Sequence, residues 1–147
     1  MEDKKYFSVD EANALIPGLE LRFAKVMQLR AQLRANHTEL EKAGEPPTAE
    51  SLQRQDGAPE LIKLRGRFRA LLEALTEELA AVEELGVAIK DLELGLCDFL
   101  GVRDGREVWL CWQYGEKHVG FWHELDAGYA SRQPLGGPTP SERRLLH

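Results

Sequence analysis

The sequence predicts an α+β fold, in which a long antiparallel helical hairpin packs with a C-terminal three-stranded antiparallel β-meander. In two long stretches before Asp91, apolar residues recur every seven positions, as they do in coiled-coil helices. After Asp91 the pattern changes to the alternation that is typical of strands. We expect one domain over residues 1–134, with the hairpin at 8–90, the meander at 93–124 and a flexible tail at 135–147.

The composition fits a compact domain that acts without nucleic acid or membrane. The chain has 147 residues, 43% of them hydrophobic, and a formal net charge of -6. Sequence-independent nucleic-acid binders neutralise phosphates with clustered Lys and Arg, whereas the basic residues here are interleaved with Glu. The first residues lack the apolar run of a signal peptide, and no apolar stretch approaches the roughly 20 residues that span a bilayer. We therefore expect a cytoplasmic protein.

The first helix is expected to begin at a capping box, Ser8-Val9-Asp10-Glu11, in which the Ser8 hydroxyl and the Glu11 carboxylate satisfy each other's backbone amides. Pro17 removes one helical hydrogen bond, so we expect a break or kink near Ile16 and a longer helix from about Pro17 to Ala43. Its apolar residues at heptad spacing predict a seam that faces a partner helix: Leu19, Val26, Leu33 and Leu40.

The second helix is expected from Pro59 to about Lys90, after a polar link from Thr48 to Pro59 that we interpret as a loop or poorly ordered segment without a site. Its heptad series is Leu61, Phe68, Leu75, Val82 and Ile89. Two helices with matching seams bury them most simply against each other. The hairpin could also be a scaffold arm that recruits a partner, but we favour a core role because each seam is satisfied by the other helix.

Three short strands are expected at 94–99, 107–113 and 118–123. The connecting sequences carry hairpin-turn chemistry: Arg103-Asp104-Gly105-Arg106 and Tyr114-Gly115-Glu116-Lys117. If both turns are centred on their middle pairs, Leu110 opposes Phe99 on one side and Phe121 on the other.

This register makes Trp109 and Trp122 direct neighbours on the sheet face that the hairpin does not cover. An exposed aromatic pair is typical of an interface or a ligand site, so we expect a homodimer that forms through this face. Arg132, just after the last expected strand, suits either an ion pair or an acidic ligand, and we favour the ion pair. Its candidate partners are Asp91, Asp98 and Glu124.

A metal site around His123 is the alternative function. Its candidate ligands are Asp91, Asp98, His123 and Glu124, since imidazole and carboxylate groups suit zinc, iron or manganese. His123 and Glu124 are adjacent and point to opposite faces of a strand, so they share an ion only if the strand ends there. Asp91 with His123 and Asp98 with Glu124 are the other combinations. The opposing interpretation is a satisfied core histidine with ordinary surface acids.

No motif in the sequence specifies a reaction, so whether the protein is an enzyme stays open. A glycine-rich phosphate loop and a Gly-x-Ser-x-Gly elbow are absent, and the sequence from His123 to Ala127 lacks the second histidine of a zinc-protease helix. Cys97 and Cys111 have apolar neighbours in the expected strands, so we expect small buried hydrophobes rather than a disulfide or a nucleophile.

Short motifs are spread in order from Phe7 to Pro134. They are Phe7-Ser8 with Glu11-Ala12-Asn13 and Pro17, Gly86 with Lys90-Asp91, Gly95-Leu96 with Asp98-Phe99, Gly105-Arg106 with Val108 and Leu110-Cys111-Trp112, Gly115-Glu116, Trp122-His123-Glu124, and Gly128 with Arg132-Gln133-Pro134. As a set they resemble the family of small bacterial proteins catalogued as domain of unknown function 2203. The resemblance implies a bacterial cytoplasmic protein and supplies no activity, substrate or cofactor. The link at 44–59 and the tail match nothing in that pattern.

Overall fold

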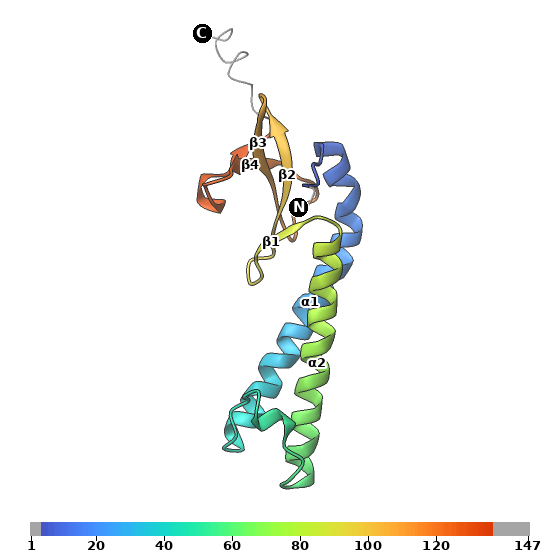
Figure 1. Cartoon of the computed structure of the whole chain (residues 1–147), viewed down its shortest axis with the longest axis vertical. Coiled ribbons are helices and arrows are strands. Elements are labelled where there is room, and N and C mark those ends of the chain that lie inside the picture. The colour runs from blue at the N-terminus through green and yellow to red at the C-terminus, as the bar shows by residue number, and fades with distance from the viewer. Residues whose placement is uncertain (1–3, 137–147) are drawn as a thin grey trace. The chain divides into compact units, whose positions relative to one another are not determined.

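The computed structural model describes residues 4–136, whose helices and strands are shown in Figure 1. These residues belong to two compact units. A helical unit comprises residues 21–82, and a sheet unit combines the chain up to Glu20 with the chain from Glu83 onward. The predicted α+β class, with two long helices and an antiparallel sheet, is confirmed. Among the described residues, no helix has the length and apolar character that crossing a membrane requires.

Helix α1 (Val9–Lys42) begins at the predicted capping box. The Ser8 amide donates to Oε1 of Glu11 at 2.9 Å, and the Glu11 amide donates to Oγ of Ser8 at 3.0 Å. Of the break or kink expected near Ile16, the break is wrong, because Pro17 lies inside one continuous helix, and the kink stays a prediction. Ile16 and Leu19 on either side of it are buried, and that burial offsets the single hydrogen bond that proline removes.

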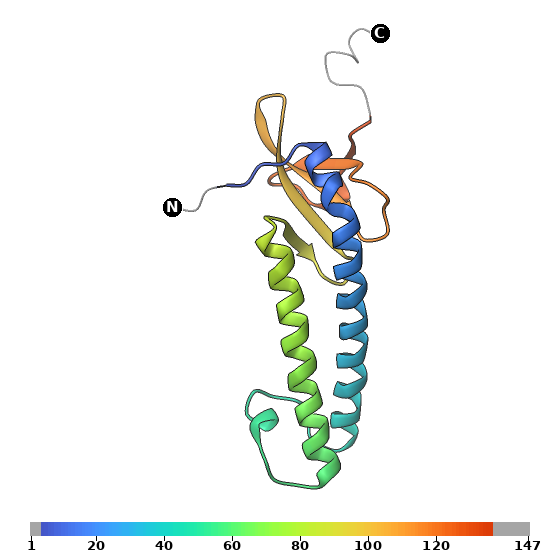
Figure 2. The same cartoon turned by 90° about the vertical axis from the view of Figure 1, so that its right-hand side faces the viewer.

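In the helical unit, α1 runs antiparallel to α2 (Pro59–Glu84), and the two helices lie side by side (Figure 2). Arg22 of α1 pairs with Glu78 of α2 at 3.0 Å. Closer to the link between the two helices, the side-chain amide of Asn36 in α1 donates to the carbonyl of Leu64 in α2 at 2.9 Å. Several predicted seam residues are buried: Val26, Leu40, Leu75 and Val82. The hairpin prediction is therefore confirmed in its topology and in these seam positions.

The link between the helices is the loop that we expected as one of two alternatives, and its defined contacts argue against the other, a poorly ordered segment. A short 3-10 helix, η1 (Ser51–Gln53), buries Leu52. Arg65 of α2 donates from Nε and Nη2 to the carboxylate of Glu45, at 2.7 and 2.9 Å. Its Nη1 donates to two loop carbonyls, those of Arg54 and Asp56. A buried arginine thus satisfies main-chain groups of a loop whose own composition is polar.

Within residues 4–136 the sheet has five antiparallel strands in sequential order, two more than predicted. They are β1 (Ala88–Asp91), β2 (Leu96–Arg103), β3 (Arg106–Gln113), β4 (Phe121–Glu124) and β5 (Gln133–Pro134). The prediction of a helix to Lys90 is wrong because Gly86 has a φ of 91°, which ends the helix and lets β1 pair with β2. Such short strands offer too few alternations to be recognised in a sequence.

The β2–β3 hairpin forms in the predicted register, with Phe99 opposite Leu110. Its turn places Asp104 and Gly105 at φ values of 53° and 78°, as a two-residue turn of this type requires. One face of this hairpin packs on the N-terminal segment of the chain, where the rings of Phe7 and Phe99 meet edge to face with centroids 5.3 Å apart.

The β3–β4 register differs from the prediction by one residue. Leu110 pairs with Trp122 rather than with Phe121, and Trp109 pairs with His123. The expected tight turn is a longer connection over residues 114–120, in which the Val119 amide donates to Oδ1 of Asn13 at 2.7 Å. This contact with α1 holds the connection outside the strand pairing. Because side chains alternate along a strand, a shift of one residue moves every side chain of β4 to the other face.

The predicted tryptophan pair therefore does not form. Trp122 shares a face with Leu110 and is buried, whereas the half-buried Trp109 lies on the opposite face beside His123. Self-association stays a prediction, now without the pair that motivated it. The predicted flexible tail falls mostly on residues 137–147, which lie outside the described part of the chain; Leu135 donates its amide to the carbonyl of Gly120 at 2.8 Å.

Candidate functional site

Three ionisable side chains are buried together on the sheet face that carries Trp109. Asp98 of β2, Cys111 of β3 and His123 of β4 are 2%, 1% and 4% exposed. One potential ligand atom from each lies within 4.8 Å of the other two. Asp98 directly opposes Cys111, and the observed β3–β4 register brings His123 onto the same face. We refer to these three residues as the Asp-Cys-His cluster.

Both ring nitrogens of His123 face oxygen atoms. Nδ1 lies 2.9 Å from the main-chain oxygen of Glu124, and Nε2 lies 2.9 Å from Oδ2 of Asp98. A carbonyl oxygen can only accept a hydrogen bond, so this arrangement assigns a proton to Nδ1. Nε2 then either donates as part of an imidazolium or presents its lone pair to the carboxyl group.

The carboxyl group of Asp98 is incompletely satisfied. Oδ1 is buried and has no hydrogen-bond partner among residues 4–136. Burial raises the pKa of Asp98 above its ordinary value, while His123, the Cys111 thiol and Lys90 act in the opposite direction. An unpartnered buried oxygen costs stability unless a further group binds it.

The two cysteines are buried and unpaired, as predicted. Burial and the charge of Asp98 raise the pKa of the Cys111 thiol to about 12, and the same two causes raise that of Cys97 to about 12. Both thiols are therefore protonated at neutral pH in the metal-free protein, which disfavours either as a nucleophile. Cys111 nevertheless lies beside Asp98 and His123, where a bound cation would lower the pKa of its thiol and favour the thiolate.

A cavity of about 110 Å³ lies beside the cluster. The cluster residues form part of its wall, together with Lys90 of β1, Trp109 of β3 and residues of the segment that follows β4, among them Leu125 and Tyr129. Nζ of Lys90 lies 4.1 Å from the centroid of the Trp109 ring. The cluster therefore borders a small cavity whose wall also carries the ammonium group of Lys90.

Asp91 and Glu124, the other two predicted metal ligands, form different contacts. Oδ1 of Asp91 accepts the amide of Leu94 at 2.9 Å, and the carboxylate of Glu124 pairs with Arg106 at 2.5 Å. The Arg106 pairing lowers the pKa of Glu124. Cys111 takes their place beside Asp98 and His123. The predicted β2–β3 register already set Cys111 opposite Asp98, so the missing signal was the position of His123.

Arg132 forms an ion pair, as favoured from the sequence, but none of the three predicted partners is the right one. Its Nη2 donates to both carboxylate oxygens of Glu116, at 3.0 and 2.7 Å. The guanidinium also lies over the rings of Phe121 and Tyr129, 3.7 and 4.9 Å from their centroids. Arg132 therefore ties the connection after β3 to the segment before β5.

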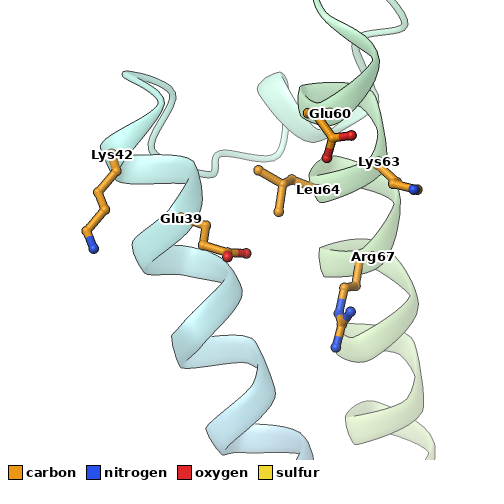
Figure 3. Close-up of a pocket in the computed structure, with 6 residues that line it drawn as sticks. All are labelled: Glu39, Lys42, Glu60, Lys63, Leu64 and Arg67. Carbon is orange, nitrogen blue, oxygen red and sulfur yellow. The ribbon is translucent and has the colours of Figure 1, made fainter.

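A larger cavity, of about 520 Å³, lies in the helical unit (Figure 3). Its wall carries acidic and basic side chains from both helices: Glu39, Lys42, Glu60, Lys63 and Arg67, with Leu64. All of these except Leu64 are charged, and each helix contributes both signs. Such a lining does not select a ligand of either charge, and the cluster in the sheet unit is the stronger candidate site.

Residues 5–135 match a protein family described as an uncharacterized conserved protein, DUF2203. The match spans nearly all of the described chain and confirms the resemblance seen in the sequence motifs. No curated protein and no solved structure matches this chain. With its family match extending over both the helical and the sheet unit, the chain belongs to the DUF2203 family.

Proposed function

We propose that this protein binds a divalent transition-metal ion, preferentially zinc, through Asp98, Cys111 and His123. The observation that carries the proposal is the buried cluster, whose three potential ligand atoms lie within 4.8 Å of one another. Thiolate, imidazole and carboxylate are the ligand types that zinc takes in proteins. Of the metals that the sequence suggested, manganese suits this set least, because it prefers oxygen ligands to a thiolate.

The contact of His123 with the main chain supports this assignment. Metal-binding histidines commonly donate their second ring N–H to a carbonyl or carboxylate, which orients the ring and leaves the other nitrogen free to bind. Here Nδ1 faces the carbonyl of Glu124, and Nε2 is the nitrogen on the side of Asp98. Oδ1 of Asp98, which has no partner in the described part of the chain, supplies a second buried acceptor at the same place.

The charge of the cluster also favours a dication. Without a cation, burial opposes ionisation of both Asp98 and Cys111, which is why both pKa values are raised. A bound dication would stabilise the carboxylate and the thiolate together and would leave a centre with no net charge. The bacterial cytoplasm implied by the family resemblance suits such a site, because a reducing compartment keeps Cys111 as a thiol.

Metal analysis of protein purified without an affinity tag tests the proposal. After growth in medium supplemented with zinc, iron and manganese, we expect about one equivalent of bound zinc. Cys111→Ser and His123→Ala should each remove it. Cys97→Ser is the matched control, because Cys97 is equally buried in the neighbouring strand and lies outside the cluster. Metal content below about a tenth of an equivalent in the parent protein, or equal loss in all three variants, would contradict the proposal.

A further inference from the structure

We infer that the proposed metal site takes a small anion at its open coordination position and that Lys90 selects the charge of that ligand. The inference rests on the proposed function. Three protein ligands leave one position of a tetrahedral zinc ion for water or an external ligand. All three cluster residues belong to the wall of the 110 Å³ cavity, so the position that the protein does not fill opens into that space.

The charge at the cavity wall favours an anion. Around a dication, ionised Asp98 and Cys111 give a neutral centre, and the described charged side chain that remains at the wall is Lys90. Its Nζ lies 4.1 Å from the centroid of the Trp109 ring, and Trp109 belongs to the same cavity wall as the three cluster residues. A positive charge placed beside a metal-bound ligand stabilises the negative form of that ligand.

The size of the cavity limits what that ligand can be. A volume of about 110 Å³ is well below the roughly 300 to 1,000 Å³ of pockets that hold drug-sized ligands. After a metal ion is placed, the space admits a few non-hydrogen atoms, as in formate, acetate or bicarbonate, and excludes a nucleotide or a peptide. Leu125 and Tyr129 at the wall are partly exposed, so the cavity has an apolar border toward solvent. The ligand class is therefore a small monoanion, a short carboxylate or an anion of similar size.

Cobalt(II) substitution of the whole protein tests this inference, since cobalt reports both the protein ligands and the open position in its visible and near-ultraviolet spectrum. We expect a thiolate-to-cobalt charge-transfer band that Cys111→Ser removes and Cys97→Ser retains. Adding azide or acetate should shift the d–d bands in a saturable way. Lys90→Met keeps the length of the side chain and removes its charge, so it should weaken azide and acetate binding by about tenfold. Its cobalt affinity should be unchanged or slightly higher. Lys63→Met, on α2 in the helical unit, is the matched control and should bind both anions as the parent does.

The outcomes separate the two proposals. A parent protein that binds no cobalt overturns the metal site and this inference with it. Cobalt binding with the Cys111-dependent band, but without any spectral response to azide or acetate, overturns the inference alone. An anion response that Lys90→Met leaves at full affinity overturns the role of Lys90. A weakened response in Lys90→Met, with the charge-transfer band intact, supports the inference.

Discussion

The helical unit and the sheet unit both bury charged side chains, but they satisfy them differently. Arg65 and Asp98 are 1% and 2% exposed. Arg65 directs its guanidinium at the carboxylate of Glu45 and at two loop carbonyls. In contrast, one oxygen of Asp98 has no hydrogen-bond partner within residues 4–136 and lies beside a thiol, an imidazole and a cavity. Burial of a charged group therefore does not by itself mark a site. An unsatisfied buried atom among other ligand groups is the better indicator.

Asn36 shows that an unsatisfied buried atom does not mark a site unless other ligand groups lie beside it. Its Oδ1 is also buried without a partner among residues 4–136, while its Nδ2 donates to Leu64. Asn36 is neutral and belongs to no described cluster of three metal-binding groups. A single polar residue in a helical seam is typical of a device that sets the register of the two helices. The unsatisfied atom becomes a candidate ligand only where other ligand atoms converge with it.

The largest expected effect concerns the two faces of the sheet unit. Trp122→Ala should destabilise the protein by about 3 to 5 kcal/mol, because Trp122 is buried on the face that carries Leu110. Trp109→Ala should cost less than about 2 kcal/mol, since the ring is half-buried and lines a cavity. Urea unfolding of both metal-free variants measures the difference. Equal losses would show that the observed assignment of faces is wrong.

The helical unit should depend strongly on the partner of Arg65. Glu45→Gln leaves that guanidinium buried without its carboxylate, and we expect the melting temperature to fall by at least about 5 °C. Asp56→Asn is the control, because the pair that Asp56 forms with Arg54 is exposed on both sides and should matter little. A similar loss in both variants would remove the distinction between a buried and an exposed pair.

Glu45→Gln should also change how the melting temperature depends on pH in the acid range. Arg65 lowers the pKa of Glu45, so the stability that this carboxylate provides is present above the pKa of the unfolded chain and is lost as the pH falls through the lower, folded value. Parent and Glu45→Gln should therefore approach each other in melting temperature as the pH drops below 4.5, the ordinary value for glutamate. A difference that persists unchanged into strong acid would mean that the charge of Glu45 is not its cause.

Removing the buried carboxyl group of Asp98 should not destabilise the metal-free sheet unit, in contrast to the loss expected for Glu45→Gln in the helical unit. Asp98→Asn takes away a carboxyl group whose ionisation burial opposes, and its new N–H can donate to Nε2 of His123. We expect the metal-free variant to melt at the same temperature as the parent or slightly above it. Zinc at about 100 times its dissociation constant should stabilise the parent by about 2.7 kcal/mol and the variant by nothing. Calorimetry with chelator and with zinc measures both, and a large loss without metal would identify Asp98 as a purely structural group.

Self-association through the sheet should have the smallest effect on stability, and sedimentation is its measurement. If the homodimer prediction is right, the parent protein sediments as a dimer at micromolar concentration. Trp109→Gln changes the partly exposed tryptophan and keeps Trp122 in the core, so it should give a folded monomer if this face is the contact. A monomeric parent would end the prediction, and a dimeric Trp109→Gln would move the contact to another surface.

Local signals in the sequence were sufficient for much of this fold. The capping box at Ser8 and the turn at Asp104-Gly105 each involve residues within a few positions of one another, and both are present as predicted. The heptad series likewise predicted the hairpin of α1 and α2. Two of the three cluster residues could also be placed together from the sequence, because the β2–β3 register alone sets Asp98 opposite Cys111.

The pairing of β4 depends on contacts between residues that lie far apart in the chain. Asn13 accepts the amide of Val119, 106 positions further along the chain, and Arg132 binds Glu116 in the same connection. No local pattern encodes these contacts, yet together they hold residues 114–120 in a longer path than a tight turn would take. Because strand side chains alternate with a period of two, that single-residue difference buries Trp122 and sets His123 beside Asp98. Local sequence patterns thus indicated the two helices and the strands β2, β3 and β4, whereas the packing of distant residues set which side chains meet.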